Sequence, residues 1–103
     1  MKRDDLLRWA MAARPGQSVA YHHGFLARDC GTAEDGVRTH AQNMLRATRT
    51  MARALSDAHV VCLVQRRLGA EVFDYIALRT ARDIPNTLTG RVITAFAEAL
   101  QAA

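Results

Sequence analysis

A helical periodicity between residues 37 and 55 is the feature that most constrains the fold of this chain. The apolar residues recur at the spacing i, i+4, i+7, i+8, i+14, i+15 and i+18, which gathers them on one side of an α-helix. They are Val37, Ala41, Met44, Leu45, Met51, Ala52 and Leu55. Thr32 or Asp35 in the preceding loop can cap this helix. We therefore expect one long helix that buries its apolar side against the rest of the molecule.

The other side of this predicted helix carries basic residues without acids. At about 100° per residue, five polar side chains fall within an arc of about 80°, away from the apolar side. They are Arg38, Gln42, Arg46, Arg49 and Arg53. Arginines three or four residues apart repel one another, and no acid follows until Asp57. A polyanionic partner would explain this pattern, because the guanidinium fork suits phosphate. The alternative is a solvated helix face in a chain with thirteen arginines and one lysine.

Two segments rich in β-branched and aromatic residues predict a β-hairpin. They are HVVCLVQRR, from residue 59, and VFDYIALRT, from residue 72. The sequence LGAE lies between them, with Gly69 as the expected turn residue. A shorter segment, QSVAYHH from residue 17, can join the hairpin as a third strand. The sequence thus predicts a small antiparallel sheet.

Shorter helical patterns flank these elements. A first helix over residues 5–14 would follow Asp4 as its cap and stop at Pro15. The segment FLARDC, from residue 25, suits one or two helical turns. A last helix, from about residue 87 to 101, has an apolar stripe formed by Leu88, Val92, Phe96 and Leu100. This stripe predicts a homodimer interface, and the alternative is that the helix folds back onto its own domain.

The element order is helix, strand, helix, helix, strand, strand, which is similar to that of a winged-helix domain. The expected fold is therefore α+β in a single domain over residues 1–103. Its winged-helix-like core would span residues 4–80 and its additional C-terminal helix residues 86–102. The segments YHHGFLARD and VCLVQRRLG…FDYIALR resemble small uncharacterised proteins of proteobacterial phages and prophages. That resemblance implies a phage-related context and no particular chemistry.

These observations predict a small regulator that binds double-stranded DNA. In a winged-helix arrangement, the N-terminal half of the long helix approaches the major groove. The candidates for base contacts there are Arg38, His40, Gln42, Asn43 and Arg46. Arg49 and Arg53 would contact phosphate, as would Arg66 and Arg67 at the hairpin tip. The second hypothesis is a protein-interaction module that binds an acidic host or phage protein through the same basic face, without nucleic acid.

The sequence favours binding over catalysis. His22, His23 and Cys30 lack the spacing of metal ligands, and no Gly-rich phosphate loop or catalytic motif is present, so we expect no enzyme, metal or cofactor. Half of the residues are hydrophobic, and 23% are charged, a composition typical of a folded domain. No apolar run approaches the roughly 18 residues of a membrane span. The first residues do not resemble a signal peptide, so a cytoplasmic protein without a membrane partner is expected.

Overall fold

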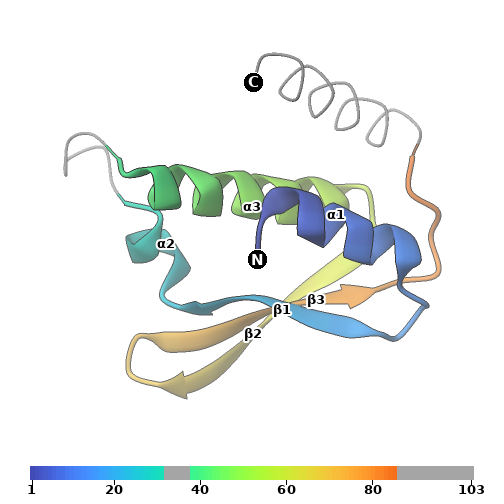
Figure 1. Ribbon diagram of the computed structural model, residues 1–103. Coiled ribbons are helices and arrows are strands. Elements are labelled where there is room, and N and C mark those ends of the chain that lie inside the picture. Colours follow the sequence, from blue (N-terminus) through green and yellow to red (C-terminus); the bar gives the residue numbers. More distant parts are fainter. Residues whose placement is uncertain (32–37, 86–103) are drawn as a thin grey trace, which may run out of the picture.

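The computed structural model describes residues 1–31 and 38–85 and places helices over one side of a three-stranded sheet (Figure 1). The elements are α1 (Arg3–Ala12), β1 (Ser18–Gly24), α2 (Leu26–Asp29), α3 (His40–Asp57), β2 (Val61–Gly69) and β3 (Val72–Arg79). The α+β class is confirmed. The predicted last helix, with Leu88, Val92, Phe96 and Leu100, lies outside the described residues, so the dimer interface stays a prediction.

The sheet is antiparallel, with β3 in the centre and β1 and β2 at its edges. Both the hairpin and the addition of the first strand to it are thereby confirmed. Tyr75 and Ala77 of β3 are buried beneath the helices. Their direct partners on β2 are Gln65 and Leu63, and directly paired residues point to the same face of a sheet. Gln65 and Leu63 therefore belong to the helix-covered face.

The opposite face of the sheet carries an apolar patch that no described element covers (Figure 1). Ile76 and Leu78 of β3 lie there, paired with Val64 and Cys62 of β2. Val64 is 46% exposed and Leu78 is 37% exposed. Within the described part of the chain, this face is open to solvent, and we call it the open face.

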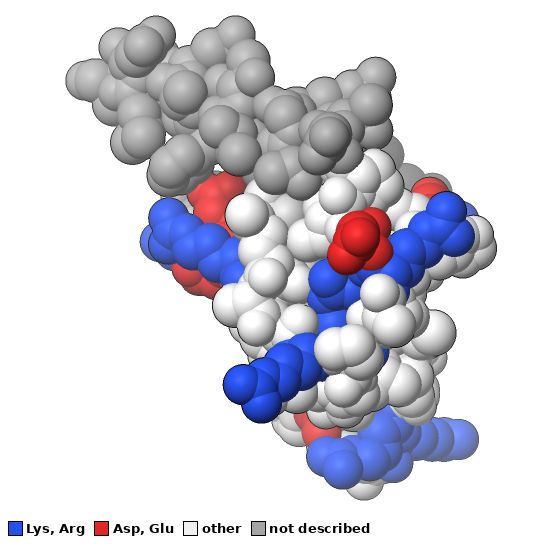
Figure 2. Space-filling model, turned by 90° about the vertical axis from the view of Figure 1, so that its right-hand side faces the viewer, with Lys and Arg blue, Asp and Glu red and all other residues white. Residues whose placement is uncertain are grey.

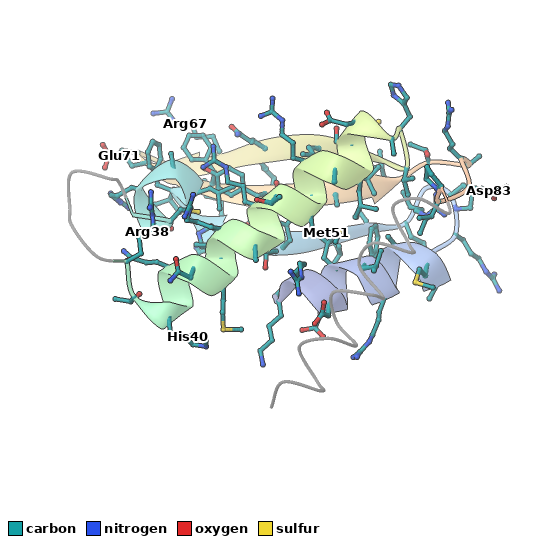
Figure 3. All side chains as sticks on the ribbon, turned by 90° about the horizontal axis from the view of Figure 1, so that it is seen from above. Arg38, His40, Met51, Arg67, Glu71 and Asp83 are labelled. Carbon is teal, nitrogen blue, oxygen red and sulfur yellow. The ribbon has the colours of Figure 1, made fainter. Side chains whose placement is uncertain are left out.

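The core lies between the helix-covered face of the sheet and the helices α1 and α3. These helices pack side by side, and α3 crosses the strands obliquely (Figure 3). Leu6 and Ala10 of α1 and Leu55 of α3 have no exposed surface. Met51 and Ala52 are buried on the same side of α3. The predicted apolar periodicity of the long helix is thus confirmed for the residues at its centre and end.

The start of α3 is fixed by a reciprocal cap. The Thr39 hydroxyl accepts a hydrogen bond from the backbone N–H of Gln42 at 3.1 Å, and the Gln42 side chain accepts one from the Thr39 N–H at 2.8 Å. The helix therefore begins at His40, and Arg38 precedes it. The prediction that Thr32 or Asp35 caps this helix is therefore wrong, because Thr39 is the cap; Thr32 and Asp35 themselves lie outside the described residues.

The first helix begins and ends two residues earlier than the sequence predicts. It spans Arg3–Ala12 instead of residues 5–14, so Asp4 lies in its first turn and not at its cap. Ala13 already has an extended backbone, with φ −71° and ψ 144°. The restriction that Pro15 places on Arg14 is therefore not what ends the helix.

The hairpin turn also differs from the prediction in detail. Gly69 belongs to β2 and has no positive φ, whereas Glu71 has a φ of +57°. The turn thus uses a non-glycine residue in the left-handed region, which is uncommon outside Gly, Asn and Asp. The Glu71 carboxylate accepts a hydrogen bond from Arg28 of α2 at 3.0 Å, and this contact links the turn to the body of the molecule.

Arg79 at the end of β3 joins the sheet to the end of α1. Its Nε donates to the carbonyl of Ala10 at 2.8 Å. Its Nη1 lies within hydrogen-bond distance of three more carbonyls, those of Val60, Thr80 and Arg82. Carbonyls in the last turn of a helix have no partner within the helix, and a cation there is favourable. The Arg79 guanidinium therefore links the end of α1 to the backbone around the start of β2 and the end of β3.

A second polar junction joins β1 to α2. His22 Nε2 lies 2.7 Å from Asp29 Oδ2, which also accepts a hydrogen bond from the Phe25 N–H at 3.0 Å. Gly24 between them has a φ of +136°, and a Cβ there would lie 2.5 Å from the same carboxylate oxygen. The hydrogen bond from His22, aided by that from Phe25, holds the pKa of Asp29 below its ordinary value.

Candidate functional site

Three exposed arginines, Arg46, Arg49 and Arg53, lie along one side of α3. No ion pair or hydrogen bond joins their side chains to any residue that the structure describes. We call these three residues the arginine stripe. All three line one shallow hollow of about 330 Å³, together with Thr50, Ala54 and Asp57. The predicted clustering of these three arginines is thus present in the structure.

Two arginines of the stripe also border a larger hollow between α3 and the hairpin. Arg49 and Arg53 form one wall of this hollow, and its volume is about 520 Å³. Its other lining residues are Tyr21, Leu26, Ala27, Leu63, Val64, Gln65 and Tyr75. We call it the α3–β2 groove. Among the described residues, this lining contains two cations and no acid.

The electrostatics of Tyr21 show that Arg49 acts on the interior of this groove. Tyr21 is only 5% exposed, and burial raises the pKa of its phenol, with the neighbouring Tyr75 acting in the same direction. The positive charge of Arg49 acts against this shift and favours the phenolate. The guanidinium therefore lies close enough to influence the buried side of the groove as well as its rim.

Two of the residues predicted to read bases are engaged in local structure. Arg38 donates from Nε to the carbonyl of Cys30 at 3.2 Å and from Nη2 to that of Gly31 at 3.4 Å. Gln42 forms the cap of α3 with Thr39. Both side chains thus stabilise the backbone around the start of α3 instead of standing free.

Two other predicted base-reading residues lie on a different side of α3. His40 and Asn43 line a hollow of about 250 Å³ with Lys2, Arg3 and Asp4, beside the start of α1. Figure 3 shows His40 projecting outward at the beginning of α3. The structure therefore does not bring His40 and Asn43 together with Arg49 and Arg53 in one site.

The two hairpin arginines point to opposite faces of the sheet. Arg67 pairs in register with Phe73, two residues before Tyr75, so it belongs to the helix-covered face. Figure 3 places it at the hairpin end of the molecule, near Glu71. Arg66 lies on the open face, where its Nη2 donates to Asp74 Oδ2 at 2.7 Å. Only Arg67 shares a face with the arginine stripe.

Asp74 carries two basic partners. His23 Nδ1 lies 2.7 Å from its Oδ1, so a row of His23, Asp74 and Arg66 crosses all three strands. The hydrogen bond from His23 is the main cause that holds the pKa of Asp74 below its ordinary value, and the hydrogen bond from Arg66 acts in the same direction. Glu71, which follows the hairpin tip, pairs with Arg28 of α2 and not with either hairpin arginine.

The surface at the other end of the molecule has a mixed charge. Figure 2 shows it from the side at which α1 and α3 end, and acidic side chains lie beside projecting basic ones there. The arginine stripe differs because its three basic side chains are gathered along one side of a single helix, with no ion pair to a described residue.

The sequence analysis did not single out the polar and aromatic members of the α3–β2 groove. Gln65 is polar at a helix-facing position of β2, where Val61 and Leu63 precede it at alternate positions. That break in the apolar alternation is the signal that marks it. Tyr21 and Tyr75 carry no such signal, since their burial explains them as core residues.

The described residues also limit other types of site. They contain no helix that is long and apolar enough to cross a membrane. Among residues 1–31 and 38–85, no three His, Cys, Asp or Glu side chains are grouped so as to hold a metal ion. Comparison of the chain with protein-family models, curated proteins and solved structures found no match.

Proposed function

We propose that this protein binds double-stranded DNA through the arginine stripe and acts as a small regulator, in keeping with its resemblance to phage and prophage proteins. The observation that carries the proposal is the stripe itself: three exposed arginines on one side of α3, none paired with a described acid. Clustered basic side chains on one side of a helix match the electrostatics of a nucleic-acid surface.

The geometry favours contact with the phosphate backbone over the reading of bases. The element order resembles that of a winged-helix domain, but α2 has only four residues and does not contact α3 extensively. Arg38 and Gln42 are committed to the backbone, whereas His40 and Asn43 face another side. Phosphate contacts orient a protein on DNA without reading its sequence. We therefore infer that electrostatic attraction dominates binding and that sequence preference is weak.

Fluorescence polarisation with a labelled random duplex tests the proposal. The parent protein should bind at about 50 mM salt and weaken steeply towards about 200 mM as counterions are released. Replacing Arg46, Arg49 and Arg53 by alanine should reduce affinity by about tenfold or more, because three phosphate contacts are lost. Circular dichroism should show an unchanged fold.

A charge-matched variant separates the stripe from net charge. Lys2, Arg14 and Arg82 are exposed and lie outside the stripe, and replacing them by alanine removes the same three charges. This control should keep most of the parent affinity. Equal losses in the two variants would reduce the stripe to a contribution to net charge, and a parent protein that binds no duplex at low salt would refute the proposal.

A further inference from the structure

The outer edge of β2 is an unpaired strand edge with little protection. β2 pairs with β3 on one side, and no described strand pairs with its other side. Its first five residues, VCLVQ, contain no charge and no proline. Native proteins usually protect such an edge with charges, proline, a bulge or a cover. In β2 such protection lies only towards the far end of the strand. It consists of Arg66 and Arg67 and of the register shift between Arg67 and Gly69.

The two faces beside this edge differ in chemistry. On the helix-covered side, the α3–β2 groove reaches Leu63 and Gln65, with Arg49 and Arg53 opposite. On the open face, Val64 is almost half exposed, next to Ile76. A strand added beside β2 would direct alternate side chains to these two faces, because the side-chain period of a strand is two.

We propose that the free edge of β2 receives an extended segment of another protein in which acidic and apolar residues alternate. Backbone hydrogen bonds to β2 would provide part of the affinity, as in other additions of a strand to a sheet edge. Acidic side chains on one face of the segment would pair with Arg49 and Arg53. Apolar side chains on its other face would extend the apolar surface around Val64. This proposal does not depend on DNA binding.

Charge complementarity favours this partner over a second copy of the same strand. β2 contains no acid, so a second β2 would leave Arg49 and Arg53 unpaired. It would also bring a second Arg67 towards the helix-covered side. An acidic segment satisfies both cations of the groove wall, and it does so without involving Arg46, which does not line the groove.

A synthetic peptide, acetyl-TEVEVET-amide with a fluorescent label, tests the edge directly. Its three glutamates alternate with valine, so one face is acidic and the other apolar. Two control peptides have the same charge: TEEEVVT, which breaks the alternation, and TEVEVET with methylated backbone nitrogens on one edge. Polarisation measures affinity, and hydrogen exchange measures the protection of β2 amides.

The alternating peptide should bind the full chain and protect amides of residues 61–67, whereas both controls should bind at least about tenfold more weakly. The double variant Arg49→Ala, Arg53→Ala should lower the affinity for the alternating peptide by about three- to thirtyfold, the range for two exposed ion pairs. Arg46→Ala, which removes a charge of the arginine stripe outside the groove, should change the affinity for the peptide by less than about twofold. Circular dichroism shows that the variants remain folded.

Three results would overturn the proposal. The first is no binding of the alternating peptide at millimolar concentration. The second is equal binding of the alternating peptide and its methylated form, which would reveal charge attraction without strand addition. The third is a doubled mass by light scattering, with β2 amides already protected without peptide, which would make a second copy the occupant of the edge.

Discussion

Arg79 and Arg49 carry the same side chain and use it in opposite ways. Arg79 lies at the end of β3, and four backbone carbonyls surround its guanidinium. Arg49 lies in the middle of α3, exposed, with no ion pair or hydrogen bond to a described residue. One arginine completes the fold, and the other leaves its charge available to a ligand. The net charge of +4 therefore says less about binding than the presence or absence of partners does.

This comparison extends to the remaining charged groups. Arg38 and Arg66 belong with Arg79, since carbonyls hold the first and Asp74 holds the second. Arg46 and Arg53 belong with Arg49. Hydrogen bonds that involve a charged group contribute more to stability than neutral ones, whereas exposed charges without partners contribute little. Stability and binding should therefore respond to different arginines.

The largest expected effect concerns the stability of the fold. Arg79→Ala should lower the free energy of unfolding by about 2–4 kcal/mol, because it leaves part-buried carbonyls without their charged donor. Arg49→Ala should change it by less than about 0.5 kcal/mol, as surface substitutions usually do. Urea denaturation followed by circular dichroism measures both. If Arg49→Ala lowered the free energy of unfolding as much as Arg79→Ala does, the distinction between the two arginines would be wrong.

Next in size is the dependence of DNA binding on salt. Each of Arg46→Ala, Arg49→Ala and Arg53→Ala should reduce the slope of log affinity against log salt by about one, if each arginine neutralises one phosphate. Arg38→Ala should leave that slope nearly unchanged, because its guanidinium is bound to the carbonyls of Cys30 and Gly31. Polarisation titrations at several salt concentrations give the slopes. A full unit lost at Arg38 would show that bound arginines reach DNA as well.

The sequence predicted the elements well because their patterns are local. The 3.6-residue period of the long helix, the two β-rich segments and the short LGAE connection each express a single element or turn. The caps were predicted less well. Thr39 and Gln42 form the cap of α3, yet the apolar Val37 extended the expected helix past them.

The site was predicted only in part, since it depends on tertiary contacts. Angular spacing along one helix was sufficient to group Arg46, Arg49 and Arg53. It could not show that Arg38 binds carbonyls after α2. Nor could it show that β2 forms the opposite wall of a groove. Those contacts follow from how α3 crosses the sheet, which no local pattern encodes.

A smaller effect should appear as a pH dependence of stability at Asp29. Its pKa is depressed in the folded state, so its contribution is present above the unfolded value, near 3.8, and is lost as pH falls through the folded value. Asp29→Asn should therefore be less stable than the parent at pH 7. The difference between the two proteins should shrink towards pH 3 and below.

Denaturant unfolding at pH 7, 5 and 3 measures this change. His22→Gln removes the other member of the pair and should show the same trend, because the hydrogen bond from His22 is the main cause of the shift. A stability difference that stays constant from pH 7 to below pH 3 would mean that the Asp29 charge contributes nothing and that Asp29 acts only through its shape.

The smallest expected effect distinguishes the two hairpin arginines, which are adjacent in sequence and differ in partners. Arg67 faces the same side as the arginine stripe, and within the described part of the chain its side chain donates just one hydrogen bond, from Nε to the nearby Gly69 carbonyl. Arg66 is held by Asp74 on the open face. Arg67→Ala should weaken duplex binding by about two- to fivefold, the range for one exposed charge contact, whereas Arg66→Ala should change it less than about twofold.

Asp74→Asn sharpens the comparison, because it removes a negative charge and frees Arg66, so duplex affinity should rise slightly in this variant. Equal losses at Arg66 and Arg67, with no gain at Asp74, would show that the hairpin contacts DNA through both faces, and an existing ion pair would then not decide which arginines take part in binding.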